Sequence, residues 1–359
     1  MSKLFSDLAR IAGNEFSSRA EDGLPAGDVD DFIDTGSYSL NALLSGSIFG
    51  GMPNNKILAL AGEEATGKTF FALGIIKHFL DKNKDAGVFY FESEGALTKE
   101  ILESRGIDLK RLVIFPVTTI QEFRTQALKV VNAYMELEKQ PPFMMVLDSL
   151  GNLSTTKEVE DITAGSETRD MTRTQLIRGT FRVLSLKLSK AKVPFIFTNH
   201  TYQTMDMFRP KEMSGGGGVR YAASQIVFLS KSKDRDKSTK ELLGNVITCL
   251  LNKSRLTKEG TKVQTKLSFT TGLNPYYGLV EIAIKHGIMK KLAKQVELPD
   301  GTKVTVNKLY NGGDKYFTDD LLNQIDKVCK EEFMYGLDLV VDALDLEHEE
   351  ESEEVVGEE

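Results

Sequence analysis

The sequence predicts an α/β protein with a mostly parallel central sheet, a short N-terminal helix and a small α+β unit at the C-terminus. Between residues 57 and 198, short apolar runs alternate with longer segments of helical periodicity, which is typical of a parallel sheet covered by helices on both faces. The string G-x4-G-K-T directly follows the first apolar run and precedes a helical segment. After residue 278 the pattern changes to short helices and a hairpin.

Residues 1–30 are expected to form a helix and a linker. Leu4, Leu8 and Ile11 recur at helical spacing on one face. The glycines and proline of residues 23–27 indicate a polar linker. Because a segment of this length is too small for a core of its own, the helix either frays or docks on another surface.

Residues 31–285 are expected to hold the central sheet. The candidate strands are Ile57–Ala61, Val88–Phe91, Leu112–Phe115, Met144–Leu147, Pro194–Thr198, Ile226–Ser230, Val246–Leu251 and Lys262–Phe269. The candidate helices between the early strands are Phe70–Leu80, Gln121–Lys139 and Met171–Ala191. The later strands come without long helices between them, so we expect the sheet to end in antiparallel strands.

Residues 286–346 are expected to form a small α+β domain. The helix Leu279–His286 leads into a hairpin around Pro299–Gly301, where the Asp-Gly pair supplies the turn. A further helix is predicted from Thr318 to about Leu346. Residues 347–359 are predicted to be a disordered acidic tail, because they contain eight Glu and no Lys or Arg.

Composition limits the class of protein without choosing a partner. Of 359 residues, 41% are apolar and 27% charged, which excludes a chain disordered throughout. No apolar run is long enough to cross a membrane. Cys249 and Cys329 stand far apart without neighbouring His or Cys, which argues against zinc and disulfides and for a reducing cytoplasm. The acidic tail accounts for the net charge of −7, so the rest of the chain is near neutral and DNA binding is not excluded.

The string from residue 62 to residue 69 predicts a nucleotide phosphate site. Its glycines let the backbone curl so that successive N–H groups point at phosphate oxygens, and the helix that follows adds a favourable dipole. Lys68 would neutralise the β- and γ-phosphates, and the Thr69 hydroxyl would bind Mg²⁺. The candidate nucleotide-binding residues here are Gly62, Glu63, Glu64, Ala65, Thr66, Gly67, Lys68, Thr69 and Phe70.

Two further strand ends supply carboxylates for this site. The apolar strand Phe143–Leu147 ends in Asp148, a position beside the phosphates and the metal. Without the phosphate motif, an Asp at a strand end is usually only a cap or a turn former. The strand Val88–Phe91 delivers Glu92 and Glu94, either of which could orient the attacking water. The sequence alone does not choose between these two.

Two polar stretches are candidates for contact with DNA. Ser154–Asp170 is expected to be a loop, followed by a helix with arginine pairs four residues apart, although a solvated basic face is the simpler interpretation. Thr201–Gly218 is expected to be a glycine-rich loop whose apolar and basic side chains suit insertion between stacked bases, although an ordinary surface loop is the simpler interpretation. Arg220 and Tyr221 would then begin the next element. The candidate DNA-binding residues are Arg169, Arg173, Arg178, Tyr202, Met205, Phe208, Arg209, Lys211, Gly215, Gly216 and Arg220.

One more basic cluster, Lys253 and Arg255, follows the strand Val246–Leu251. Two cations at a strand end are most often a solvated edge. They could also reach a γ-phosphate bound by a neighbouring subunit, as arginine fingers do.

In order and spacing these motifs resemble the RecA-type recombinases, and among them the UvsX recombinases of T4-type bacteriophages. The likeness covers residues 31–285 well, the C-terminal unit loosely and the first 30 residues hardly at all. The resemblance rests on these sequence segments: Thr35–Ser37, the string at 62–69, Glu94, Asp148–Leu153, Asp170–Arg173, Asn199–Tyr202, Gly215–Gly218 and Lys253–Arg255.

The resemblance implies a RecA-type P-loop NTPase core and a DNA-dependent ATPase that uses ATP and Mg²⁺. Such a protein forms helical filaments on single-stranded DNA and exchanges strands with homologous double-stranded DNA in recombination, repair and replication. It works in the cytoplasm, here of an infected bacterial host, with a single-strand-binding protein and a recombination mediator as further partners and no membrane. The N-terminal helix would pack on an adjacent subunit.

The resemblance also assigns roles to single residues. Glu94, not Glu92, matches the water-activating carboxylate, Asp148 the metal-binding acid, and His200 the polar residue that senses the γ-phosphate. Ile101 stands where the family carries an aromatic residue near the adenine, so that the base would meet an aliphatic side chain there.

Three other assignments follow from the same likeness. Residues 154–170 and 201–219 match the two DNA-binding loops, and Lys253 and Arg255 match the cations that act on the neighbour's ATP.

Two alternative functions share the same core. One is a hexameric DNA helicase, against which the lack of a separate large N-terminal domain argues. The other is a DNA-binding scaffold whose ATP site governs assembly with little turnover.

Overall fold

The computed structural model describes residues 3–13, 20–24, 26–166, 171–202, 212–236 and 239–335. The α-helices are α1 (Lys3–Ile11), α2 (Tyr38–Ser45), α3 (Lys68–Lys82), α4 (Lys99–Ser104), α5 (Ile120–Met135), α6 (Thr156–Thr163), α7 (Arg173–Lys190), α8 (Gly216–Ala222), α9 (Leu279–Lys285), α10 (Val306–Gly312) and α11 (Asp319–Phe333). Short 3-10 helices are η1 (Ala20–Asp22), η2 (Leu109–Arg111), η3 (Leu150–Asn152) and η4 (Gly313–Lys315).

The strands of the main sheet are β3 (Ile57–Gly62), β4 (Gly87–Glu92), β5 (Leu112–Pro116), β6 (Phe143–Asp148), β7 (Phe195–Tyr202), β8 (Glu212–Met213), β9 (Gln225–Arg235), β10 (Leu242–Ser254), β11 (Lys262–Ser268) and β12 (Gly272–Asn274). Two smaller sheets contain β1 (Phe32–Ile33) with β2 (Met52–Pro53), and β13 (Lys290–Lys291), β14 (Val296–Glu297) and β15 (Lys303–Val304).

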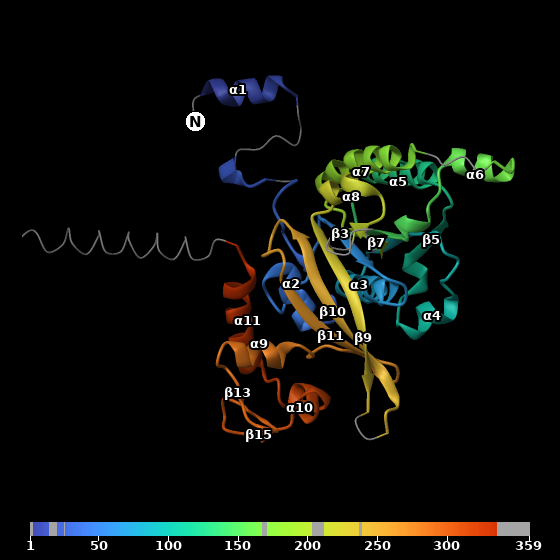
Figure 1. Ribbon diagram of the computed structural model, residues 1–359. Coiled ribbons are helices and arrows are strands. Elements are labelled where there is room, and N and C mark those ends of the chain that lie inside the picture. The colour runs from blue at the N-terminus through green and yellow to red at the C-terminus, as the bar shows by residue number, and fades with distance from the viewer. Residues whose placement is uncertain are drawn as a thin grey trace, which may run out of the picture.

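Within the described residues, the main sheet has ten strands in the order β12-β11-β10-β9-β3-β7-β6-β4-β5, with β8 paired to β7. Figure 1 shows β9, β10 and β11 side by side. All neighbours from β9 to β5 run parallel. β10, β11 and β12 continue the sheet antiparallel. The predicted fold class is therefore confirmed, including the antiparallel strands at one end.

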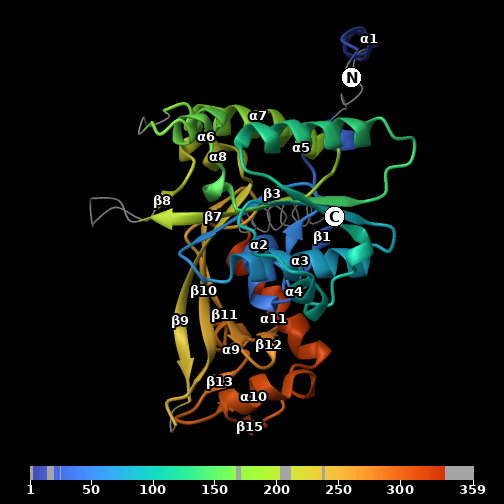
Figure 2. The ribbon, with the colours of Figure 1, turned by 90° about the vertical axis from the view of Figure 1, so that its right-hand side faces the viewer.

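Helices cover both faces of this sheet, and each face has its own hydrophobic core (Figure 2). On one face, Phe71 and Ile75 of α3 are fully buried in the first core. On the other, Phe123 of α5 and Phe181 of α7 are buried in the second. Because both faces are covered, every residue of β3 and β6 is buried, which explains the continuous apolar runs in the sequence.

The C-terminal unit shares the first of these cores with the sheet. Helix α11 packs against α2 and α9, and the Asp326 carboxylate accepts hydrogen bonds from the Ser47 hydroxyl at 2.6 Å and the Ile48 N–H at 2.8 Å. β14 and β15 pair antiparallel on either side of the predicted Asp-Gly turn. The hydrophobic cluster runs without a break across residues 285 and 286, so the division into domains at that point remains a prediction.

Two terminal segments complete the fold. Helix α1 forms as predicted, with Leu8 and Ile11 exposed, and the surface on which it docks remains a prediction. The helix predicted to reach about Leu346 ends at Phe333, and residues 336–359, with the acidic tail, lie outside the described residues. Within the described residues, no helix combines the length and the apolar character needed to span a membrane.

The prediction that residues 154–170 form a loop was wrong, because α6 lies within them. Thr155 begins this helix with a capping box: its side chain accepts from the Glu158 N–H, and the Glu158 side chain accepts from the Thr155 N–H. The Thr-x-x-Glu spacing was present in the sequence as a helix start. Residues 167–170 lie outside the described part of the chain.

The prediction of a glycine-rich loop up to residue 218 was wrong as well, because α8 begins at Gly216. Gly215 precedes it with a φ of 93°, a left-handed conformation that favours glycine. A Cβ at Gly218 would lie 2.5 Å from the Cβ of Arg178, so α8 packs against α7 at a distance that only glycine permits. Arg220 and Tyr221 therefore lie at the end of this helix and do not begin the next element.

Candidate functional site

The string at residues 62–69, called the phosphate string below, lies at the carboxyl end of β3 and the start of α3. Its two glycines are required for different reasons. A Cβ at Gly62 would lie 2.7 Å from the Leu229 carbonyl oxygen, so this position needs glycine because another strand passes close by. Gly67 has a φ of 91° and precedes the first residue of α3. The resulting turn presents a helix N-terminus to its concave side, an arrangement suited to phosphate.

The Lys68 side chain lies inside this turn and is only 8% exposed. Its ammonium donates hydrogen bonds to the carbonyl oxygens of Gly62, at 3.1 Å, and Glu63, at 2.9 Å. Burial lowers the pKa of Lys68, while the nearby carboxylates of Glu94 and Asp148 oppose this shift. The lysine is thus held where an anion in the turn would meet it.

The Asp148 carboxylate, 6% exposed, is the centre of a hydrogen-bond network on neighbouring strands. One oxygen accepts from the Thr69 hydroxyl at 2.6 Å and from the Tyr90 hydroxyl at 2.7 Å. The other accepts from the Thr198 hydroxyl. Burial and the Asp148 charge raise the pKa of Tyr90, which keeps this phenol protonated as a donor. Thr69 and Asp148 were predicted from the sequence as site residues, whereas Tyr90 and Thr198 were not.

The oxygens of Thr69 and Asp148 fit a magnesium ion bound together with phosphates. Mg²⁺ prefers oxygen ligands and usually takes one or two from the protein and the rest from phosphates and water. Among the described residues, no cluster of three or more His, Cys, Asp or Glu could hold a metal, so a metal bound by protein side chains alone is not indicated there.

Glu92 and Glu94, which the sequence left as alternatives, have different surroundings. The Glu92 side chain closes the turn after β4 by accepting from the N–H groups of Glu94 and Ala96, at 3.1 Å and 3.0 Å. One carboxylate oxygen of Glu94 lies 3.6 Å from the Nε2 of His200. Glu92 thus has a structural task, whereas Glu94 faces the predicted sensor residue across the site.

His200 connects this site to the second DNA-binding candidate. Its carbonyl oxygen accepts from the Ser214 N–H at 3.2 Å, and the side chain of Asn199 donates to the Ser214 carbonyl at 2.7 Å. β7, which carries both residues, continues to Tyr202 and pairs with β8. β7 therefore passes Glu94 at His200 and then forms, with β8, a two-stranded stem. Residues 203–211, between these two strands in the sequence, lie outside the described residues.

The structure describes some of the candidate DNA-binding residues. Tyr202 and Arg178 are exposed on β7 and α7, and Arg220 is exposed on α8, which Gly215 and Gly216 begin. Arg173 instead points inward: its guanidinium donates to the carbonyl oxygens of Leu150, Gly151 and Leu153 and so holds η3. Arg169, Met205, Phe208, Arg209 and Lys211 lie outside the described residues.

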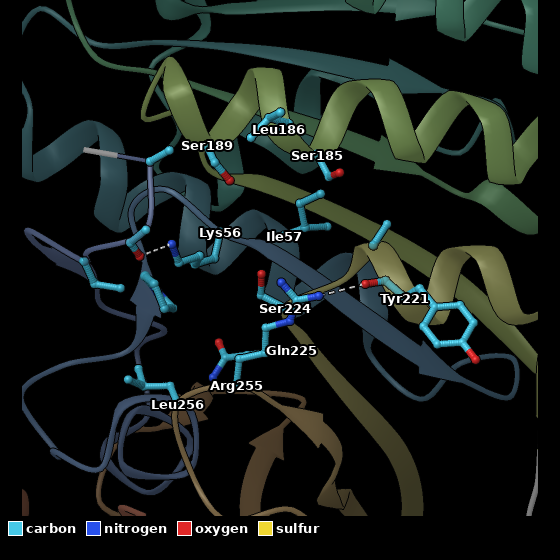
Figure 3. Close-up of a pocket in the computed structure, with 15 residues that line it drawn as sticks. Lys56, Ile57, Ser185, Leu186, Ser189, Tyr221, Ser224, Gln225, Arg255 and Leu256 are labelled. Atoms are coloured by element: carbon cyan, nitrogen blue, oxygen red, sulfur yellow. Dashed lines mark hydrogen bonds between the residues drawn. The ribbon is translucent and has the colours of Figure 1, made fainter. Parts of the chain in front are cut away.

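Lys253 and Arg255 hold the C-terminal end of α8. The Lys253 ammonium donates to the carbonyl oxygens of Arg220 and Ala223, both at 2.6 Å, and of Tyr221 at 3.3 Å. Arg255 donates to the Tyr221 carbonyl at 3.1 Å and lines a cavity of about 440 Å³ (Figure 3). Free carbonyls at a helix C-terminus attract cations, so both side chains have a favourable partner within the single chain.

Burial lowers the pKa of Lys253 to about 8, and the neighbouring charges of Arg255 and Arg220 add to this effect while Glu259 opposes it. Lys231 of β9 is a cation that was not among the sequence candidates. Its ammonium donates to the carbonyl oxygen of Glu64, within the phosphate string, at 3.1 Å.

Ile101 and Phe70, the remaining nucleotide-binding candidates, lie on α4 and on the first turn of α3. Ile101 is 38% exposed. Phe70 is half-buried, and the guanidinium carbon of Arg105 lies 4.0 Å from the centre of its ring. Arg105 follows α4 directly and was not among the sequence candidates.

Comparisons with known proteins match the same part of the chain. Residues 23–274 match the family model described as RecA N-terminal domain. The Recombination and repair protein of Enterobacteria phage T4 is 33% identical over 261 residues, which cover 73% of this chain but only 65% of that protein. Protein RecA of Thermotoga maritima is 27% identical over 267 residues, 72% of this chain and 69% of that protein. Protein RecA of Malacoplasma penetrans is 25% identical over 270 residues, covering 72% and 78%.

Proposed function

The chain belongs to the RecA family, and from this premise we propose that it is an ATP-dependent DNA recombinase. It forms filaments on single-stranded DNA, pairs that DNA with a homologous duplex and exchanges strands, with ATP hydrolysis driving release. The name of one relative supports this proposal, since the phage T4 protein is called a Recombination and repair protein.

The observation that carries the proposal is the continuity between the nucleotide site and the stem of the second DNA-binding candidate. A carboxylate oxygen of Glu94 lies 3.6 Å from Nε2 of His200, and two hydrogen bonds join residues 199 and 200 to Ser214, two residues before α8. A γ-phosphate that moved His200 would therefore also move the stem that carries residues 203–211. This is a physical route by which DNA and ATP affect each other's binding.

Within the site, each described side chain has a task in hydrolysis. Lys68 and the N–H groups of the string bind the β- and γ-phosphates, and Glu94 accepts a proton from the attacking water. Thr69 and Asp148 would hold Mg²⁺, which supplies charge neutralisation on the phosphate oxygens. Tyr90 and Thr198 fix the orientation of the Asp148 carboxylate.

Assembly places Lys253 and Arg255 against the triphosphate of a neighbouring subunit. In the single chain they bind main-chain carbonyls of α8, and a phosphate is the stronger partner because its charge is a full one. ATP between subunits then stabilises the filament, and hydrolysis weakens it. The N-terminal helix α1 adds a second contact to the adjacent subunit.

The partners are single-stranded DNA, homologous duplex DNA and further copies of the chain, with a single-strand-binding protein and a loading mediator as accessory proteins. The working compartment is the cytoplasm of an infected bacterial host.

The proposal is tested by the ATPase rate of the purified chain with and without single-stranded DNA. We expect clear stimulation by DNA, and no turnover with K68A at any DNA concentration. R255A should bind ATP but lose the stimulation, whereas R235A, which removes an exposed arginine at the end of β9, should keep it.

Three results would contradict the proposal. Equal rates with and without DNA would exclude a DNA-dependent ATPase. Tight nucleotide binding with negligible turnover would favour an assembly scaffold. Closed rings with directional unwinding would favour a hexameric helicase.

A further inference from the structure

The nucleotide site lacks an aromatic ring at position 101, but the next turn of the same helix supplies a different flat surface. Ile101 and Arg105 are four residues apart, so both project from one side of α4 and its C-terminal cap. The Arg105 guanidinium lies over the face of the Phe70 ring, 4.0 Å from its centre. Phe70 directly follows Thr69, the last residue of the phosphate string.

Arg105 carries a charge without a matching anion. Among the described residues, the Arg105 side chain makes no hydrogen bond and no ion pair, and its one cation–π contact is with the Phe70 ring. Burial lowers the pKa of Arg105, with no opposing carboxylate. A guanidinium that is partly removed from water and bound only through one planar face leaves its other face available for a second flat group.

The pair borders a cavity of about 360 Å³ along α3. Its apolar walls include Tyr38, Leu73, Leu273 and Pro275, and its polar lining residues are Asp34, Thr35, Lys77 and His78. The first turn of a helix rises about 5.4 Å, so this cavity begins within the reach of a ribose attached to phosphates at the start of α3. Apolar walls with a few polar groups are typical of a site for a planar heterocycle.

We propose that Phe70 and Arg105 form the platform on which the base of the bound nucleoside triphosphate stacks. This inference rests on the proposed function and extends it, because it assigns the base to a ring-and-guanidinium pair and not to Ile101. The base covers the outer face of the guanidinium, so that the cation lies between two π-systems. Arginine serves this purpose and lysine does not, because only the guanidinium is planar.

The test separates the base from the phosphates by comparing two ligands. The affinities of the full chain for Mg²⁺-ATP and for inorganic tripolyphosphate with Mg²⁺ are measured by titration calorimetry. R105Q should weaken ATP binding about tenfold and leave tripolyphosphate binding within about twofold of the unmutated chain. F70L, which keeps an apolar side chain of similar size, should weaken ATP binding about threefold, again without an effect on tripolyphosphate.

Two controls complete the experiment. K99A removes another cation from α4, whose side chain is 70% exposed, and should change neither affinity. R105K keeps the positive charge but lacks the planar guanidinium, so its affinities for ATP and tripolyphosphate should resemble those of R105Q.

Three outcomes would overturn the inference. These are no change of ATP affinity in R105Q, an equal loss for ATP and tripolyphosphate, and full rescue by R105K, since the last two would mean that Arg105 acts as a charge on phosphate. An unmutated chain that binds neither ligand would contradict the proposed function itself, a result that differs from all three.

Discussion

The Asp148 carboxylate accepts hydrogen bonds from hydroxyl groups on three different elements, and these bonds fix its position before any ligand binds. Thr69, Tyr90 and Thr198 all donate to it. Hydrogen bonds to a charged acceptor contribute about 1.5–3 kcal/mol each, so the carboxylate has little freedom to rotate. A Mg²⁺ ion bound here would be held by this preformed carboxylate oxygen and by the Thr69 hydroxyl.

Glu94 and Glu92 allow a matched test of which carboxylate acts on water. We expect E94Q to lower the rate constant of ATP hydrolysis by at least 100-fold, because the amide cannot accept a proton, while ATP affinity stays close to that of the unmutated chain. E92Q should retain most activity, since its side-chain oxygen can still accept from the N–H groups of residues 94 and 96. Rates under single-turnover conditions measure this, and a reversed order of the two variants would contradict the assignment.

At the scale of single residues, the sequence predicted site residues that lie in one local string or at a strand end. Lys68, Thr69 and Asp148 belong to this group. Tyr90, Thr198 and Arg105 were out of its reach because their partners come from elements distant along the chain. Tyr90 donates across from β4 to β6, and only the register of these strands brings the two side chains together.

Among the elements, α8 lies between the β7–β8 stem and the two cations at the end of β10. It follows the β7–β8 stem, packs against α7 and ends on the cations Lys253 and Arg255. The glycine run in the sequence indicated a loop because glycine disfavours helices by about 1 kcal/mol per residue. The close packing of α8 on α7 overrides this preference, because a side chain at Gly218 would occupy the space taken by Arg178.

Two neighbouring glycines of α8 test this packing. G218A should lower the free energy of unfolding by about 1–3 kcal/mol, because its Cβ would lie 2.5 Å from the Cβ and 2.8 Å from the Cα of Arg178. G217A should leave it unchanged or raise it by up to about 1 kcal/mol, since the nearest atom is the Tyr221 ring at 3.6 Å. Denaturant titration of both variants measures the difference, and equal stabilities would show that α8 does not pack this closely on α7.

The proposed contact of Lys253 with the triphosphate of a neighbouring subunit should depend on pH. Its pKa is lowered to about 8, so the fraction that carries a charge falls as the pH rises from 7 to 9. Since only the ammonium form attracts phosphate, ATP-dependent assembly should weaken over this range. K253R should assemble almost equally at both pH values, because the guanidinium stays charged. Light scattering measures this, and an equal decline for both proteins would exclude Lys253 as the cause.

In the whole molecule, the two halves of the proposed ATP site lie on different elements of one chain. The phosphate string joins β3 to α3, whereas Lys253 lies near the end of β10, Arg255 follows that strand directly, and both bind the end of α8. Periodicity predicted the order of strands and helices well, because both faces of the sheet are covered and the strands are continuously apolar. It could not predict that the C-terminal unit shares a core with the sheet, because that depends on contacts such as Asp326 with Ser47.

The most direct test of the account is sedimentation velocity of the purified chain with Mg²⁺, a non-hydrolysable ATP analogue and a single-stranded oligonucleotide. We predict large assemblies only when all three are present, and a strong reduction in R255A. A chain that stays monomeric in the complete mixture would contradict the claim that a triphosphate between subunits holds the filament together.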